Sequence, residues 1–330
     1  MTNTVSEAAH IKIIQLIAKE LGVGPPQVAA AVLLLDEGST VPFIARYRKE
    51  ATDNLDDTQL RNLEERLLYL RELEERRAAI LASIEEQGKL TGELSAAIEA
   101  AATKQTLEDI YLPYKPKRRT RAQIAREAGL EPLADALFAD PTLDPEQEAA
   151  KYVNGRPAAD NGVPDAKAAL EGARDILAER FAETAELLAS LRRRMWEQGI
   201  VTSNVLKGKE SAEEEKFRDY YDYSETIRTI PSHRALALFR GQSLGVLKIE
   251  LGLGEKIESV VDTVAAAAVP HPCAAMIAAH FGIEERGRRA DKWLADVCHW
   301  TWRVKTHPHI STELLAQLRE AAEAEAIKIF

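Results

Sequence analysis

The sequence predicts a mainly α-helical fold: a multi-helix scaffold with long helices, a helix-turn-helix-like subdomain and at most a short β element. Apolar residues recur at three- and four-residue spacing through most of the chain, as on the buried face of a helix. One such stripe runs without a break signal from Asp57 to Gln87. Clear alternation of apolar and polar residues, typical of a strand, occurs over Leu247–Leu251.

The length and charge of the chain limit its organisation and its partners. With 330 residues it can bury a large core and divide into subdomains. We expect a helical scaffold over residues 1–102, a basic elbow with a helix-turn-helix-like subdomain over 103–200, and a mixed, then helical segment over 201–330. The formal net charge is −10. Because phosphate contacts dominate nucleic-acid affinity, any contact with nucleic acid must be a local patch, and binding should be weak.

Several classes of protein are excluded by composition. No apolar run approaches the roughly 20 residues needed to cross a bilayer, so no membrane contact is expected. The N-terminus lacks the basic start and apolar core of a signal peptide. Two cysteines, Cys273 and Cys298, are too few for a disulfide framework, and a cytoplasmic location is expected.

The first 102 residues are predicted to form a helical scaffold, because glycines and prolines separate successive amphipathic stretches. The expected helices are Val5–Leu21, Pro25–Glu37, Phe43–Arg48, Asp57–Gln87 and Leu90–Ala102. Asp56 with Gln59 predicts a capping box at the start of the long helix. Glu74 and Arg77 interrupt its leucine stripe, which favours an intramolecular scaffold helix over a dimeric coiled coil.

A small basic cluster lies at the end of the predicted helix Phe43–Arg48. It consists of Arg46, Arg48 and Lys49. Planar guanidinium groups pair well with carboxylates on neighbouring helices. Ion pairing inside the scaffold is therefore favoured over contact with a ligand.

The chain is organised around Thr103–Leu137. A helical lead-in to Tyr111 meets Pro113 and Pro116, which cannot continue a helix. The segment Pro113–Arg121, called the basic elbow, contains no carboxylate. Its five cations are Lys115, Lys117, Arg118, Arg119 and Arg121. Two interpretations stay open, a phosphate-facing patch and a solvated loop.

A helix–glycine–helix pattern follows the elbow. Gly129, four residues after Ala125, half-fits a helix-turn-helix, in which glycine adopts backbone angles that other residues resist. The second helix would begin at Pro132 and carries Asp135 and Asp140 but no lysine or arginine. A helix that reads the major groove presents hydrogen-bond donors to phosphates and bases. A structural helix pair is therefore favoured over a groove reader.

The remainder is expected to be mostly helical. We expect a short helix at Pro145–Val153, one long helix from Pro164 to Gly199, a charged mobile connection over Ser203–Tyr223 and a helix at Ser232–Phe239. A strand at Leu247–Leu251 and three or four helices from Glu255 to Phe330 follow. The last helix reaches Phe330 without a stop signal, which favours a truncated chain.

No arrangement of residues predicts catalysis. His271–His309 contains both cysteines and five histidines, but the H-x-C and H-x-H pairs and irregular gaps do not suit tetrahedral zinc. Ser232 and His233 are adjacent, Gly252–Gly254 is a lone GxG, and no Walker-type phosphate loop occurs. We expect no enzyme activity, no metal and no cofactor.

Three long strings carry a resemblance to a known family. They are TVPFIARYRKEAT (Thr40–Thr52), TLEDIYLPYKPKRRTRAQIAREAGLEPLADAL (Thr106–Leu137) and IPSHRALALFRG (Ile230–Gly241). Over essentially its whole length the chain resembles the Tex family of bacterial transcription accessory proteins. Arg46, Arg48 and Lys49 are characteristic of that family without an established role.

The resemblance implies a non-catalytic region that binds RNA or DNA and acts with the transcription machinery. It also implies further partners, because the family has an RNase H-like domain, helix-hairpin-helix elements and a C-terminal OB-fold domain that binds RNA, none visible here. The chain is thus expected to be the N-terminal part, truncated before the RNase H-like domain. The alternative is a protein–protein interaction scaffold without direct nucleic-acid contact.

Overall fold

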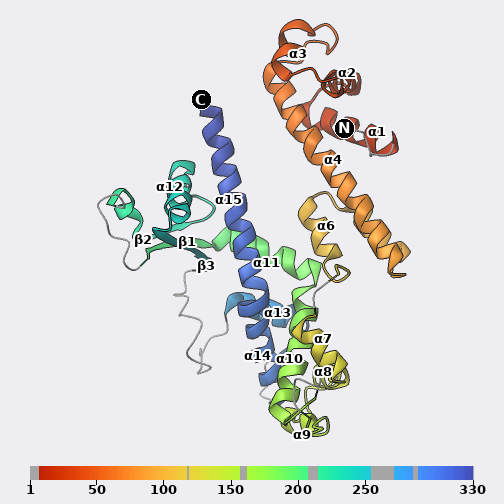
Figure 1. The fold of residues 1–330 in the computed structure, drawn as a ribbon, viewed down its shortest axis with the longest axis vertical. Helices are drawn as coiled ribbons and strands as arrows, with labels where there is room; N and C mark the ends of the chain where they lie inside the picture. Colours follow the sequence, from red (N-terminus) through yellow and green to blue (C-terminus); the bar gives the residue numbers. More distant parts are fainter. Residues whose placement is uncertain are drawn as a thin grey trace. The chain divides into compact units, whose positions relative to one another are not determined.

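The structure is a computed structural model that describes residues 7–116, 119–156, 162–206, 215–253, 271–284 and 289–329. The chain divides into two compact units, Met1–Lys115 and Pro116–Phe330, each treated by itself below. Both are built mainly from helices, with one small sheet in the second (Figure 1), which confirms the predicted fold class. The predicted division into three segments stays a prediction.

The first unit is arranged around one long helix, α4. Its helices are α1 (Glu7–Leu21), α2 (Pro25–Asp36), α3 (Val41–Tyr47), α4 (Asp57–Glu86), α5 (Gly92–Ala100) and α6 (Lys104–Tyr111). Helices α1, α2 and α3 pack on α4, and α5 and α6 pack on it farther along (Figure 1). These helices agree with the predicted ones to within a few residues.

Helix α4 is capped and amphipathic as predicted. The Gln59 amide donates to the Asp56 carboxylate over 2.7 Å, and the Asp56 amide donates to the Gln59 side chain over 3.0 Å. One face is buried inside the unit and carries Leu60, Leu63, Leu67, Leu70, Leu73, Ile80 and Ile84. At about 25 cal/mol per Å² of apolar surface, such a stripe dominates the stability of a small helical unit. The leucine stripe therefore belongs to an intramolecular core.

The second unit is arranged around α10. Its helices are α7 (Arg121–Glu127), α8 (Glu131–Ala139), α9 (Pro145–Ala150), α10 (Ala166–Ala182), α11 (Ala185–Gln198), α12 (Ser232–Ser243), α13 (Pro272–His280), α14 (Arg289–Trp300) and α15 (His307–Ile329). A 3₁₀-helix spans Glu215–Tyr220, and a π-helix, Thr301–Thr306, joins α14 to α15. Helices α7, α8, α9 and α14 all pack on α10.

The helix pair after the elbow exists and packs as a structural element. Gly129 links α7 to α8 with φ of +79°, a conformation that favours glycine. Gly172 on α10 allows this pair to approach closely, since a Cβ there would lie 2.4 Å from a Leu130 methyl group. Both helices thus direct their buried residues to α10.

The prediction of one long helix from Pro164 to Gly199 is wrong in one respect, because this segment forms two helices. Helix α10 ends at Ala182, and α11 begins at Ala185. Thr184 has an extended backbone (φ −83°, ψ 107°) and occupies the N-cap position of α11. Threonine suits that position better than a helix interior. The apolar spacing continues across the break and hides it in the sequence.

The sheet has strand order β2-β1-β3 and is fully antiparallel. Its strands are β1 (Ile200–Val205), β2 (Asp222–Thr226) and β3 (Leu247–Gly252). Strand β3 was predicted, and it pairs with β1 in the register Thr202 opposite Glu250. Helices α12 and α15 pack on β3.

The prediction of a mobile charged connection over Ser203–Tyr223 is wrong at both ends. Its first residues lie in β1 and its last in β2, while residues 207–214 lie outside the described ranges. Strand β1 carries three polar residues in a row, Thr202, Ser203 and Asn204, yet Ser203 is fully buried, as is Val201. The Ser203 hydroxyl donates to the Tyr220 carbonyl over 2.8 Å. A satisfied serine on the buried face explains why apolar alternation did not reveal this strand.

The C-terminal part contains the predicted helices as α13, α14 and α15, while residues 254–270 and 285–288 lie outside the described ranges. Cys273 and Cys298 are both buried and form no disulfide. Within the described ranges no group of three or more His, Cys, Asp or Glu side chains is placed to bind a metal ion. No described helix is long and apolar enough to cross a membrane.

Candidate nucleic-acid interface

The start of the basic elbow is fixed to the first unit. Tyr111 is buried at the end of α6, and its hydroxyl lies 3.0 Å from the Ser83 hydroxyl on α4. Gln87, which caps α4, donates its side-chain amide to the Tyr114 carbonyl over 2.9 Å. The Lys115 amide donates to the Tyr111 carbonyl over 3.0 Å. Lys115 thus leaves a well-defined turn with its side chain exposed.

The end of the elbow is fixed inside the second unit by one buried carboxylate. Thr120 caps α7, accepting a hydrogen bond from the Gln123 amide over 3.1 Å. Its hydroxyl donates to Glu179 of α10 over 3.0 Å. Arg126 donates to the other Glu179 oxygen over 2.7 Å. Glu179 is only 7% exposed, so its charge is compensated locally and the start of α7 is held on α10.

The described elbow cations differ in how far they are engaged. Lys115 and Arg121 are exposed, and within the described ranges neither forms an ion pair. Arg119 is also exposed but lies 2.5 Å from the Glu127 carboxylate. Lys117 and Arg118 lie outside the described residues. The elbow therefore presents at least two cations that are available to an external anion.

The second predicted cluster lies at the end of α3. Arg46, Arg48 and Lys49 are exposed, and no carboxylate of the described residues lies within ion-pairing distance of them. This corrects the interpretation that they tie neighbouring helices together. The nearest carboxylates in the sequence, Glu50 and Asp53, form no ion pair with these cations, which the sequence alone could not show.

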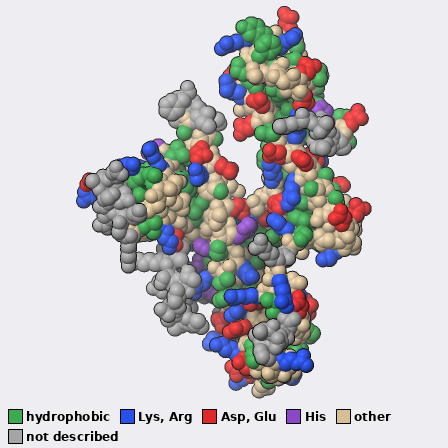
Figure 2. Space-filling view, viewed as in Figure 1, with side chains coloured by type: hydrophobic (Ala, Val, Ile, Leu, Met, Phe, Trp, Pro, Cys, Tyr) green, Lys and Arg blue, Asp and Glu red, His purple; other side chains and the backbone are tan. Residues whose placement is uncertain are grey.

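Two aromatic side chains beside these cations were not singled out in the sequence. Phe43 is 41% exposed and Tyr47 is 71% exposed. Their ring centroids lie 5.4 Å apart, because positions i and i+4 share one face of a helix. The Arg48 guanidinium lies 6.0 Å from the centre of the Phe43 ring. We call the surface formed by Phe43, Arg46, Tyr47, Arg48 and Lys49 the α3 tip; its end of the unit shows basic and hydrophobic side chains together (Figure 2).

Three arginines of α4, in contrast, are neutralised by carboxylates on other helices. Arg66 pairs with Glu20, Arg71 with Asp36 and Arg76 with Glu108, each through two hydrogen bonds. The hydrogen bonds from Arg71 lower the pKa of Asp36, and those from Arg76 lower the pKa of Glu108. Internal pairing is thus the rule along α4, and the α3 tip departs from it.

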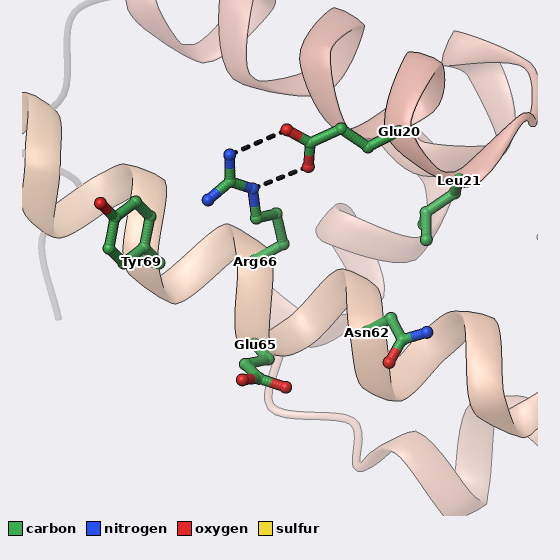
Figure 3. A pocket seen from close by; sticks show the side chains of 6 residues that line it. All are labelled: Glu20, Leu21, Asn62, Glu65, Arg66 and Tyr69. Atoms are coloured by element: carbon green, nitrogen blue, oxygen red, sulfur yellow. Dashed lines mark hydrogen bonds and ion pairs between the residues drawn. The ribbon is translucent and has the colours of Figure 1, made fainter. Parts of the chain in front are cut away.

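A pocket of about 320 Å³ lies between α1 and α4, and the arginine that lines it is already paired with a carboxylate. Arg66 reaches from α4 to Glu20 with hydrogen bonds of 2.7 and 2.8 Å, and Tyr69 lies one turn along α4 (Figure 3). The guanidinium carbon also lies 5.0 Å from the centre of the Tyr69 ring. Leu21, Asn62 and Glu65 complete the lining. The pocket contains no nucleophile next to a general base.

Comparisons with known proteins give one consistent result. The family model described as "Tex-like protein N-terminal domain" matches residues 11–85, and "Tex central region-like" matches residues 140–330. The chain is 55% identical to "Protein tex" of Bordetella pertussis over 100% of this chain and 41% of that protein. It is 50% identical to "Transcriptional accessory protein Tex" of Neisseria gonorrhoeae over 97% of this chain and 40% of that protein.

A more distant relative is found in humans. It is "S1 RNA-binding domain-containing protein 1", 29% identical over 74% of this chain and 25% of that protein. The chain spans about two fifths of the length of the bacterial relatives described above. One family model alone matches more than half of the chain, and the other matches most of the first unit. The chain therefore belongs to the Tex-like family.

Proposed function

We propose that this chain is a non-catalytic scaffold region of a transcription accessory protein and that its basic elbow contacts the phosphates of RNA or DNA. The names of the Neisseria gonorrhoeae and human relatives support a role in transcription and an association with RNA. The observation that carries the proposal is that Lys115 and Arg121 are exposed and free of ion pairs within the described ranges. They flank Lys117 and Arg118, which add two further positive charges to the same short segment.

The fixed ends of the elbow support binding to phosphate. Tyr114, near the start of the elbow, is held by Gln87 of the first unit, and Thr120, near its end, is held by Glu179 of the second. Each of these two positions is held within its own unit, so less conformational entropy is lost there when phosphate binds. The net charge of −10 opposes binding of a polyanion, so affinity in this chain is weak and local. In the longer proteins of the family, the remaining domains and the transcription machinery are the proposed partners, in the cytoplasm.

Fluorescence anisotropy with labelled single-stranded RNA and duplex DNA tests the proposal at several salt concentrations. The variant carries Lys117→Glu, Arg118→Glu and Arg121→Glu; it leaves Arg119 in place because Arg119 is paired with Glu127. Glutamate at the first position of α7 suits the helix dipole, so the fold is preserved. In a plot of the logarithm of the binding constant against the logarithm of the salt concentration, losing three phosphate contacts should reduce the steepness of the slope for a single strand by about 2.

The matched control reverses three exposed lysines outside the elbow, Lys12, Lys89 and Lys167. It changes the net charge equally and should retain most of the binding. Equal losses in both variants would mean that only overall charge matters. Binding that is absent in the wild type, or unchanged in the elbow variant, removes the elbow as a site and favours the protein–protein scaffold.

A further inference from the structure

The α3 tip combines two exposed features, a pair of aromatic rings and a cluster of cations. Its aromatic side chains, Phe43 and Tyr47, are 41% and 71% exposed. Its three cations, Arg46, Arg48 and Lys49, form no ion pair within the described ranges. Residues 46–50 include one carboxylate, Glu50, so the segment is positive in a chain that is negative overall.

The backbone behind the α3 tip is firmly held. Thr52 and Leu55 are buried at 0% and 1% exposure. The Thr52 hydroxyl lies 3.3 Å from the Lys49 carbonyl, and the Asn54 amide donates to the same carbonyl over 2.8 Å. The Gln27 side chain donates to the Asp53 carbonyl over 2.8 Å, which ties the loop to α2. The exposed side chains therefore project from a preorganised backbone.

We propose that the α3 tip is a contact site for single-stranded nucleic acid, separate from the basic elbow. Bases stack on Tyr47 and Phe43, while Arg46, Arg48 and Lys49 bind the neighbouring phosphates. Aromatic faces interleaved with cations are the recurring means of binding single strands without sequence preference. With two rings on one helix face, the site accommodates two or so bases.

Single strands suit this surface better than duplex DNA or an acidic protein. In a duplex the base faces are stacked on one another and cannot reach an exposed tyrosine ring. Protein hot spots usually place an aromatic anchor in a desolvated pocket. Tyr47 instead projects from the end of a short helix with most of its surface in water. That placement leaves its ring open to a flat partner.

The test measures binding of a labelled oligothymidylate and of an abasic strand of equal length to the full 330-residue chain. Tyr47→Ala removes the more exposed ring and should weaken binding to the oligothymidylate by about 5- to 100-fold. Tyr47→Trp retains a stacking face and should retain binding. Leu68→Ala, which removes another exposed apolar side chain of the same unit (61% exposed), serves as the matched control and should have no effect.

The abasic strand separates stacking from charge. It should bind the wild type more weakly than oligothymidylate does, and Tyr47→Ala should bind the two strands alike. Replacing Arg46, Arg48 and Lys49 by glutamine should reduce the salt slope by about 2 for both strands. The α3 tip proposal fails if Tyr47→Ala binds oligothymidylate as the wild type does, or if the wild type does not distinguish the strands.

The measurements are repeated in the elbow variant, so that the two sites are judged separately. A loss caused by Tyr47→Ala in that background establishes the α3 tip whatever the elbow does. A polyglutamate peptide is the probe for the competing class of partner. If its binding depends on Tyr47 and the three cations while oligothymidylate binding does not, the surface belongs to an acidic protein and the proposal is overturned.

Discussion

The guanidinium of Arg77 on α4 donates a 2.7 Å hydrogen bond to the carbonyl of Ala101, which caps the end of α5. A second bond of 3.1 Å reaches the Ile98 carbonyl in the last turn of α5, and Glu74 forms an ion pair with the same guanidinium. Carbonyls at a helix end lack their usual partners within the helix, and the Ile98 carbonyl accepts only a long bond of 3.3 Å from the Ala101 amide besides that from Arg77. The charge that interrupts the leucine stripe of α4 is therefore the group that fastens α5 to it.

Replacing Arg77 by methionine should destabilise the chain by about 3 kcal/mol, because it removes a buried side-chain donor from two carbonyls at the end of α5 and from the Glu74 carboxylate. Urea denaturation followed by circular dichroism measures the change. The matched control is Arg61→Met on the same helix, where an exposed arginine pairs only with Asp57 one turn away. The control should leave the unfolding midpoint nearly unchanged; similar midpoints for both variants would contradict the role of Arg77.

Arg126 and Glu179 give a second stability prediction. Arg126→Ala removes a donor 2.7 Å from a carboxylate that is only 7% exposed. The expected loss is about 2 kcal/mol, below that of a fully buried pair because the Arg126 side chain is 35% exposed. Replacing both residues by methionine should recover part of the loss, since no buried carboxylate is then left unpaired; Glu131, which also lies 3.4 Å from Arg126, is 48% exposed and stays in water. A denaturation midpoint for the double variant below that of Arg126→Ala would contradict this.

His307 makes stability depend on pH. Burial is the largest effect and lowers its pKa below the usual 6.5, although a hydrogen bond with the Leu251 carbonyl and the charge of Glu250 oppose the shift. Below about pH 6.5 the unfolded chain binds a proton more readily than the folded chain. The contribution of the neutral His307 ring to the free energy of unfolding is therefore fully present above about pH 6.5, and it falls as the pH drops toward the folded-state pKa.

The measurement compares urea denaturation at pH 7.5 and 5.5 for the wild type and His307→Gln. The variant should lose less stability than the wild type between the two pH values. The control, His233→Gln, removes an exposed histidine and should retain the wild-type dependence. An unchanged dependence in His307→Gln would show that other groups cause it.

The cysteines give a prediction about reactivity. Cys273 and Cys298 are 0% and 1% exposed, and burial raises the pKa of Cys298 to about 12. Because the thiolate is the reactive form, neither thiol should react with a disulfide reagent at pH 8 in the native chain. Both should react once the chain is unfolded in urea. Rapid labelling of the native protein would show that α13 or α14 opens locally.

Helix positions were largely predictable from the sequence, but strand and helix boundaries within the second unit were not. The capping box at Asp56 and the positive φ of Gly129 follow from local chemistry, which residues a few positions apart decide. Strand β1 depends instead on partners about fifty residues distant, such as Glu250 opposite Thr202, and on a buried serine that resembles a surface residue in the sequence. Such pairing is decided by tertiary structure.

The candidate sites show the same limit. The cations of the elbow and of the α3 tip could be located from the sequence, because charge runs are visible there. The sequence could not show whether each cation is paired with a carboxylate. Arg126 pairs with Glu179, which lies 53 positions away, while Arg48 pairs with no described carboxylate. The exposed ring of Tyr47 likewise looks in the sequence like any apolar member of a helix face.

Helix α4 sets a minimum length for any single molecule that reaches both the α3 tip and Lys115 of the first unit. The α3 tip precedes the capped start of α4 at Asp56, and Lys115 follows a turn bound to the residue that caps the end of α4, Gln87. The 30 residues between those caps extend about 45 Å. At about 3.4 Å per stacked nucleotide, that equals ~13 nucleotides. Shorter stacked strands engage one end at a time, and affinity should increase sharply with length once both ends are within reach.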